Sequence, residues 1–185
     1  MGPRYGDHLV GSGEPVLECA ATGLLPPTRR PEVVWRAGLD LNPLDVTDPA
    51  DVAWLDALIW PEHTHRRGRL RAAAAIAAAD PPVLVRGDLV DDLPGLAAQA
   101  PRGATLVVFH SSVLYQVPSD RRAAFAEVAR ALDGHWIANE SPETLAYEGL
   151  PSPPDGALHN VLALDGTPVA WTRGHGQAMA WFSPG

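Results

Sequence analysis

The chain contains no lysine, and this absence removes a group of mechanisms. Lysine and arginine together number 14 among the 185 residues, and all 14 are arginine. A Schiff base, a pyridoxal-phosphate anchor and the phosphate-binding lysine of a P-loop each need a lysine amine. The sequence therefore excludes these three kinds of chemistry.

Cysteine is almost as scarce, because Cys19 is the only one in the sequence. One cysteine can form neither an intrachain disulfide nor a cysteine-based zinc cluster. A lone cysteine can be a nucleophile, but it more often fills a small space in an apolar core. We therefore interpret Cys19 as a core residue.

Long apolar runs and an excess of positive charge are also missing. A membrane span needs about 20 apolar residues, and the alanine-rich run 72–79 is far shorter. Residues 1–10 carry no apolar segment of a signal peptide. The net charge of −8 disfavours a broad nucleic-acid surface and adhesion to an anionic membrane. We expect a cytoplasmic protein with neither nucleic acid nor membrane as a partner.

The residues that are present suit one globular domain whose strands and helices alternate. Hydrophobic residues make up 46% of the chain and charged residues 19%, which is ordinary for a soluble protein. The alternation predicts a parallel sheet with helices on both faces. The predicted strands are 33–39, 83–85, 105–109 and 135–138, and the predicted helices are 48–60, 66–79, 93–98 and 119–134.

Particular residues mark the ends of these elements. Asp48 is expected to cap a helix that has Pro49 at its first position, and Ser119 is expected to cap a later helix that Gly134 ends. The continuous apolar run 105–109 predicts a strand covered on both faces. Asp165-Gly166 predicts a hairpin turn between strands 161–164 and 167–171.

The predicted fold class is α/β, with a Rossmann-like, mostly parallel sheet and a C-terminal antiparallel hairpin. We predict an irregular N-terminal segment over residues 1–31, with one short strand at 16–20, followed by an α/β domain over residues 32–185. A last strand is expected near 177–182. An antiparallel hairpin after a parallel series is the layout of S-adenosylmethionine-dependent methyltransferases, an inference that rests on fold analogy.

Four stretches resemble an uncharacterised bacterial family, one of the domains of unknown function. The pattern R-x-G-L-D-x-N-P-L-D spans Arg36–Asp45, and W-P-E spans Trp60–Glu62 with Arg66 beyond it. Residues 107–111 and 136–140 are similar to the same family, so the resemblance covers most of the chain from about Arg4 onward. The resemblance implies a methyltransferase-like domain of which this chain corresponds to the C-terminal part.

The resemblance also implies an additional strand upstream of these stretches. Members of the family are longer, and they carry a strand and a glycine-containing loop that would cradle the cofactor. Without that first central strand, the strands ending at Asp40 and Phe109 would lose their shared neighbour. We expect that an upstream portion, the strand at 16–20 or a partner fills this position.

Acidic and polar residues follow the predicted strands, at the edge where α/β proteins bind ligands. From the resemblance, Asp40 or Asp45 lies where a methyltransferase-like fold binds the ribose hydroxyls of S-adenosylmethionine. Asp88 lies where the fold contacts the adenine amino group. Each of these carboxylates can instead cap a turn of its own loop.

His110, Ser111 and Glu140 are the candidate catalytic residues. His110 and Ser111 end the clearest strand, at the usual position for substrate chemistry in this fold, and His110 can act as a general base near pH 7. Glu140 would orient His110 or bind substrate. The alternatives are a hydrogen-bonded histidine at a strand end and a structural salt bridge.

Two further groups of residues offer other chemistry. His63 and His65 can chelate a metal from a loop, with Asp88 or His110 as a third ligand, although we predict no metal site. Four arginines form the only basic cluster, which either binds a phosphate or acidic substrate or is a solvated helical face. They are Arg66, Arg67, Arg69 and Arg71.

These features lead to one functional hypothesis and two alternatives. The first is an S-adenosylmethionine-dependent, methyltransferase-like domain that acts on an unknown small molecule. The second is a non-catalytic fragment or partner module whose polar edge residues are structural. The third is a metal-dependent hydrolase. A homo-oligomer or an upstream portion would complete the sheet.

Overall fold

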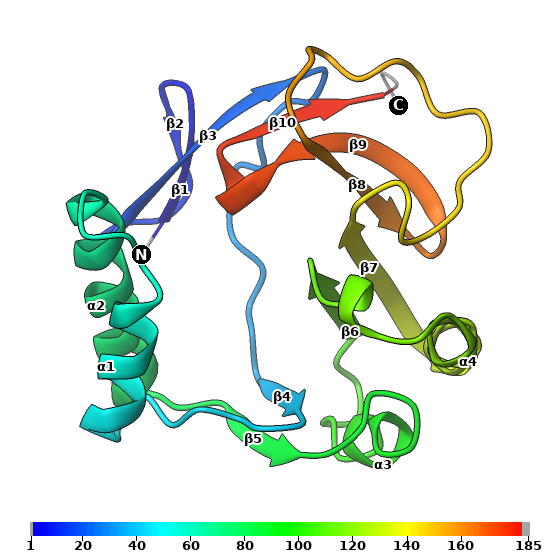
Figure 1. The fold of residues 1–185 in the computed structure, drawn as a ribbon, viewed down its shortest axis with the longest axis horizontal. Helices are drawn as coiled ribbons and strands as arrows, with labels where there is room; N and C mark the ends of the chain where they lie inside the picture. The colour runs from blue at the N-terminus through cyan, green and yellow to red at the C-terminus, as the bar shows by residue number, and fades with distance from the viewer. Residues whose placement is uncertain (1, 183–185) are drawn as a thin grey trace.

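The computed structural model describes residues 2–182, which form two sheets and four α-helices (Figure 1). The strands are β1 (Gly2–Tyr5), β2 (His8–Leu9), β3 (Val16–Thr22), β4 (Ala37–Asp40), β5 (Val83–Arg86), β6 (Leu106–Ser111), β7 (Gly134–Glu140), β8 (His159–Leu164), β9 (Thr167–Arg173) and β10 (Ala178–Trp181). The helices are α1 (Pro49–Ala57), α2 (Thr64–Ala79), α3 (Leu93–Ala97) and α4 (Ser119–Ala131), with short 3₁₀ turns η1 (Leu114–Gln116) and η2 (Gly174–Gly176).

The larger sheet combines parallel and antiparallel strands, so the predicted α/β class is confirmed. Its eight strands have the order β2-β1-β3-β10-β9-β8-β7-β6. β6 and β7 are parallel, and β8, β9 and β10 follow as antiparallel neighbours. Three strands of this order, β1, β2 and β3, come from the first 31 residues, where the sequence predicted only one. No helix of residues 2–182 is long and apolar enough to cross a bilayer.

The parallel strands are divided between two sheets. β4 and β5 form a separate parallel pair, and within residues 2–182 neither β4 nor β6 has a second strand partner. The alternative that the strand at 16–20 fills the position between them is wrong, because β3 pairs with β1 and β10 instead. The physical reason is that β1, which forms a hairpin with β2, pairs through its other edge with β3. This pairing holds β3 at the end of the larger sheet opposite to β6.

Of the two predicted helix N-caps, one is confirmed and the other is wrong. Asp48 caps α1 as expected, since its Oδ1 accepts the N–H of Ala50 at 2.8 Å. The prediction for Ser119 is wrong, because Pro118 is the N-cap of α4 and no side chain caps this helix. Gly134 begins β7, where a Cβ would lie 2.5 Å from the carbonyl oxygen of Leu106. Close approach of β6 and β7 therefore requires glycine there.

The hairpin of β8 and β9 turns at Asp165-Gly166, as predicted. Both residues have positive φ angles, 52° and 83°, which is the conformation of a two-residue hairpin turn. The Asp165 side chain also fastens the turn to β7. Its Oδ1 accepts the Trp136 N–H at 2.7 Å, and its own N–H donates to the Trp136 carbonyl at 2.8 Å.

The core lies on one face of β6, β7 and β8, under α4. Its buried members are Leu114, Phe125, Ala126, Ala129, Trp136, Ala138 and Ala163. The opposite face of β6 is open, since Val107 is 44% exposed and Phe109 is 76% exposed. The prediction that both faces of this strand are covered is therefore wrong, because α4 lies over only one of them.

Candidate functional site

The strand ends bring the predicted site residues together in two pairs. Asp40 is the last residue of β4, and its carbonyl accepts the N–H of Gly87, so Asp40 lies beside Asp88. His110 precedes the end of β6, and Glu140 ends the neighbouring strand β7. No hydrogen bond or ion pair joins the two pairs within residues 2–182, and Asp45 lies apart from both, in the loop before α1.

His110 lies between two partners in a buried hydrogen-bonded chain. Its Nδ1 lies 2.7 Å from Oε1 of Glu140, and the indole Nε1 of Trp136 lies 3.0 Å from its Nε2. The Glu140 side chain is fully buried, and the His110 side chain is 9% exposed. These side chains come from alternate positions of β6 and β7, so all three face the core under α4.

The chemistry of the partners determines the proton positions on His110. An indole N–H can only donate, so Nε2 of His110 must be the acceptor. Nδ1 then carries the proton and donates it to Glu140, and the imidazole is neutral. Because the Nε2 lone pair is occupied, proton abstraction by His110 requires the Trp136 hydrogen bond to open. The role of His110 as a general base stays a prediction.

Glu140 also holds the loop that follows β6. Its Oε1 accepts the N–H of Val113 at 3.0 Å and the N–H of Leu114 at 3.3 Å. Between them and the strand, Ser112 has a φ of 52°, a left-handed conformation that is uncommon for serine. The carboxylate therefore stabilises a sharp turn at the carboxyl end of β6.

The surroundings of Glu140 have opposing effects on its pKa. Burial raises the pKa, while hydrogen bonds from His110, Val113 and Leu114 lower it. The hydrogen bonds outweigh burial, so the pKa of Glu140 lies below its ordinary value of 4.5 and the group is ionised near neutral pH.

Aromatic rings enclose this buried chain. The rings of His110 and Phe125 meet edge to face, with centroids 5.3 Å apart, and Phe125 meets Trp136 in the same way at 5.9 Å. The guanidinium carbon of Arg130 lies over the Trp136 ring, 5.4 Å from its centroid. The imidazole is therefore fixed by packing as well as by its hydrogen bonds.

A second row of polar side chains, on the opposite face of the sheet, was not predicted. Asn139 donates to Oγ of Ser111 at 3.0 Å and accepts from the Thr172 hydroxyl at 2.6 Å. Beside them, Asn160 donates to Oγ of Ser112 at 3.0 Å. Ser111 thus faces away from His110. The alternation of Asn139 and Glu140 along β7 was the signal for two polar faces.

The carboxylates of the predicted cofactor site all make turn contacts. Oδ1 of Asp40 accepts the Asn42 N–H at 2.7 Å, and Oδ1 of Asp45 accepts the Thr47 N–H at 2.8 Å. Oδ1 of Asp88 accepts the Val90 N–H at 2.7 Å. The other carboxylate oxygen of Asp40, Oδ2, has no hydrogen-bond partner within the described residues.

Asp88 is also linked to α4 by Arg121. Nη2 of Arg121 contacts Oδ1 of Asp88 and lies 3.0 Å from Oδ2 of Asp91. Hydrogen bonds from Val90 and Asp91 and the charge of Arg121 lower the pKa of Asp88 despite its partial desolvation. Leu89, Val90 and Leu93 pack against the core under α4, so the loop after β5 is joined to the His110 region.

The residues considered for a metal site do not gather in the described structure. The rings of His63 and His65 lie edge to face, 6.2 Å apart. No group of three histidine, cysteine, aspartate or glutamate residues within 2–182 is arranged to hold a metal ion. The hydrolase alternative therefore gains no geometric support.

The fold and the strand-end residues define an α/β domain with polar side chains at the carboxyl ends of its parallel strands. The chain belongs to DUF2332, a family described as an uncharacterized protein conserved in bacteria, which it matches over residues 2–181. Comparison with curated proteins and with solved structures gave no match.

Proposed function

We propose that this chain is a methyltransferase-like domain that binds S-adenosylmethionine at the carboxyl ends of β4 and β5. The observation that carries the proposal is the position of Asp40, at the end of a parallel strand and beside the loop of Asp88. In parallel α/β sheets, ligands bind beyond these strand ends. Oδ2 of Asp40 remains available to accept hydrogen bonds from a ribose.

The methyl acceptor in this proposal is a small molecule that binds beyond β6 and β7. Ser111, Ser112 and Asn139 provide hydroxyl and amide groups there. The buried chain of Glu140, His110 and Trp136 acts as a positioning element, since it holds the turn that presents these groups. The acceptor itself is defined only by this polar, uncharged character.

The cofactor proposal is tested by titrating the chain with S-adenosylmethionine in a calorimeter. We expect saturable binding, which Asp40→Asn weakens about tenfold through loss of a charged acceptor. Asparagine keeps an oxygen for the Asn42 turn, so the fold is retained. The matched control is Asp133→Asn, which removes the same charge at the opposite end of β7, where Asp133 is exposed. Equal weakening by both variants would remove Asp40 from the site.

Absence of saturable binding by the folded wild-type chain would eliminate the cofactor.

A second candidate is a non-catalytic module with a structural strand-end edge. The observation in its favour is that Asp45 and Asp88 are occupied by turn contacts and that both nitrogens of His110 are hydrogen-bonded. The same titration separates this candidate from the first, because a structural edge predicts no binding of S-adenosylmethionine.

A further inference from the structure

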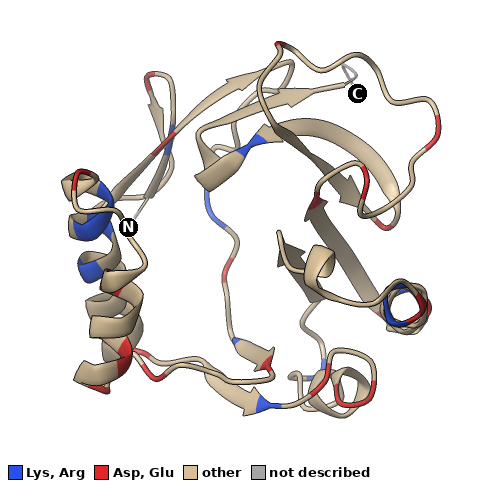
Figure 2. Cartoon of the chain, in the orientation of Figure 1, with Lys and Arg blue, Asp and Glu red and all other residues tan. Residues whose placement is uncertain are grey.

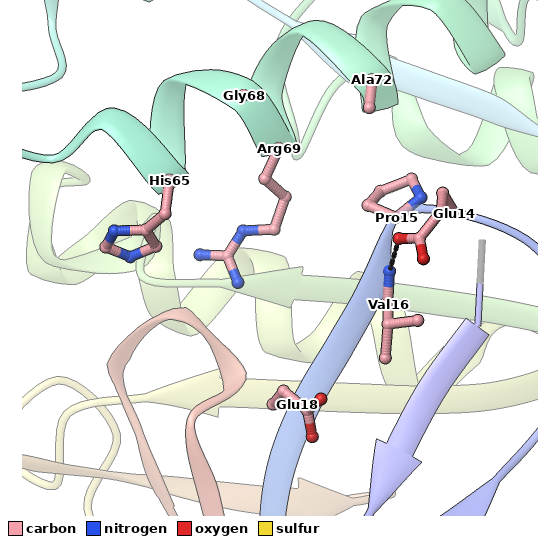
Figure 3. Close-up of a pocket in the computed structure, with 8 residues that line it drawn as sticks. All are labelled: Glu14, Pro15, Val16, Glu18, His65, Gly68, Arg69 and Ala72. Carbon is pink, nitrogen blue, oxygen red and sulfur yellow. Dashed lines mark hydrogen bonds between the residues drawn. The ribbon is translucent and has the colours of Figure 1, made fainter.

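A cavity of about 530 Å³ lies between α2 and the strands at the other end of the larger sheet. Residues 66, 69, 70 and 73 of α2 line one wall, at the helical spacing that places side chains on one face. β1, β3 and β10 contribute the opposite wall, and η2 contributes His175. A neighbouring hollow of about 410 Å³ shares Arg69 with this cavity (Figure 3).

The four arginines of α2 have two different roles. Arg67 and Arg71 both bind Asp56 of α1, so they join the two helices. Arg66 and Arg69 lie one turn apart on the cavity side, where both are half-buried. Within residues 2–182, neither of these two side chains makes a hydrogen bond or an ion pair. Figure 2 shows the basic residues gathered in the first half of α2.

His175 adds a third cationic or hydrogen-bonding group to the same cavity. It has a φ of 60° between two glycines, and a non-glycine residue in this conformation is frequently found at binding sites. Burial lowers the pKa of His175, and the charges of Arg66, Arg69 and His63 lower it further. The field of the arginines therefore reaches the imidazole ring.

Among the described residues, no acidic side chain near the cavity forms an ion pair with Arg66 or Arg69. Burial raises the pKa of the Tyr5 hydroxyl and of the Cys19 thiol, so both stay protonated and uncharged near neutral pH. Glu14 and Glu18 line the neighbouring hollow, where Glu14 accepts the Val16 N–H and Glu18 lies 3.7 Å from Arg4. Figure 3 shows Arg69 extending from α2 toward β3 beside these residues.

The rest of the cavity wall is apolar. Leu17, Ile59, Leu70 and Met179 line it together with the cationic groups. An inorganic ion alone would leave this surface exposed to water, whereas a ligand with an apolar body would bury it.

We propose that this cavity binds a small organic anion, with its phosphate or carboxylate group between Arg66 and Arg69 and beside His175. The apolar body of the ligand lies over Leu17 and Met179. Guanidinium groups form strong, directional hydrogen bonds to both kinds of anion. The site is separate from the strand ends of β4–β7 and does not depend on the proposed cofactor.

The probe for the test is monohexyl phosphate, titrated into the chain by calorimetry at pH 7 and low salt. We expect saturable binding, with roughly tenfold or more lost for each arginine removed in the Arg66→Gln, Arg69→Gln double variant. The matched control is the Arg29→Gln, Arg102→Gln double variant, which loses the same charge at two exposed positions outside the cavity. Equal thermal midpoints of wild type and the first variant would show that its fold is intact.

Three further probes separate the parts of the proposal. Hexanoate should compete with monohexyl phosphate, since both have an anionic head and an apolar body. Inorganic phosphate and hexanol should each bind more weakly than monohexyl phosphate. Equal binding of hexanol would overturn the anion site, and equal binding of inorganic phosphate would overturn the apolar part. Failure of wild type to bind monohexyl phosphate, or equal binding by the Arg66, Arg69 variant, would overturn the proposal altogether.

The pKa of the His175 imidazole provides a further test, because it should change only if the anion binds beside this ring. A bound anion offsets the charge of Arg66 and Arg69, so the pKa of His175 should rise when monohexyl phosphate is added. The groups facing the ring are His63, Arg66 and Arg69, with Tyr5 and Cys19 across the cavity. An unchanged NMR titration of His175 at saturation would contradict this placement.

Discussion

Replacing Glu140 with leucine should lower the free energy of unfolding by about 3–5 kcal/mol, because three donors lose their acceptor. These donors are Nδ1 of His110 and the backbone N–H groups of Val113 and Leu114. A buried donor without a partner costs about 1–3 kcal/mol, and leucine offers none. Chemical denaturation of the purified variant measures the loss.

Glu140→Gln is the matched variant for this measurement. Its amide oxygen can occupy the position of Oε1, which accepts from all three donors, so we expect a loss of only about 1–2 kcal/mol. Equal stability of Glu140→Leu and wild type would show that the carboxylate does not hold the turn after β6. Equal losses in the two variants would show that charge, rather than hydrogen bonding, is what matters.

The pH dependence of stability should carry the signature of the same carboxyl group. The pKa of Glu140 is lower in the folded protein than its ordinary value of 4.5. Its contribution is therefore complete above pH 4.5 and is lost as the pH falls through the folded value. Unfolding free energies measured between pH 3 and 7 should fall less steeply with acid in Glu140→Gln than in wild type. Identical slopes would contradict the assignment.

Phe125→Ala should cost about 3–5 kcal/mol, since it opens a cavity beside the buried hydrogen-bonded chain. Phe125 is 4% exposed, and its ring contacts both His110 and Trp136. The same substitution at Phe109 is the control, because that side chain is 76% exposed on the other face of β6. We expect a loss of about 0.5 kcal/mol or less for Phe109→Ala.

Thermal and chemical denaturation of the two phenylalanine variants compare the faces of the sheet directly. A large loss only for Phe125→Ala supports a core confined to the side of α4. A comparable loss for Phe109→Ala would mean that the open face of β6 is covered in solution, and the description of the core would then be wrong.

The sequence predicts the individual helices and strands of this fold better than it predicts which strands pair with one another. Asp48, Pro49 and Asp165-Gly166 mark α1 and the β8–β9 hairpin, because these signals act within one turn. The position of β3 depends on pairing with β1 and β10, which lie at opposite ends of the chain. Local patterns contain no information on such long-range pairing, and β1 and β2 were not predicted.

The same distinction applies to the candidate sites. The contact of His110 with Glu140 follows from polar residues at the ends of two adjacent parallel strands. The hydrogen bond from Trp136 was missed, because an aromatic residue in a strand is typical of a core. The sequence suggested anion binding by the arginine cluster as a whole. Only the positions of α1 and β3 show that Arg66 and Arg69 line the cavity, whereas Arg67 binds Asp56.

The most direct test of the ligand site at the strand ends is amide NMR of the ¹⁵N-labelled chain during titration with S-adenosylmethionine. We predict shifts concentrated at Asn42, Val90 and Ser112, in the loops that follow β4, β5 and β6. Saturating cofactor that leaves these amides unchanged in a folded protein, or that shifts only residues of the α2 cavity, would contradict the account.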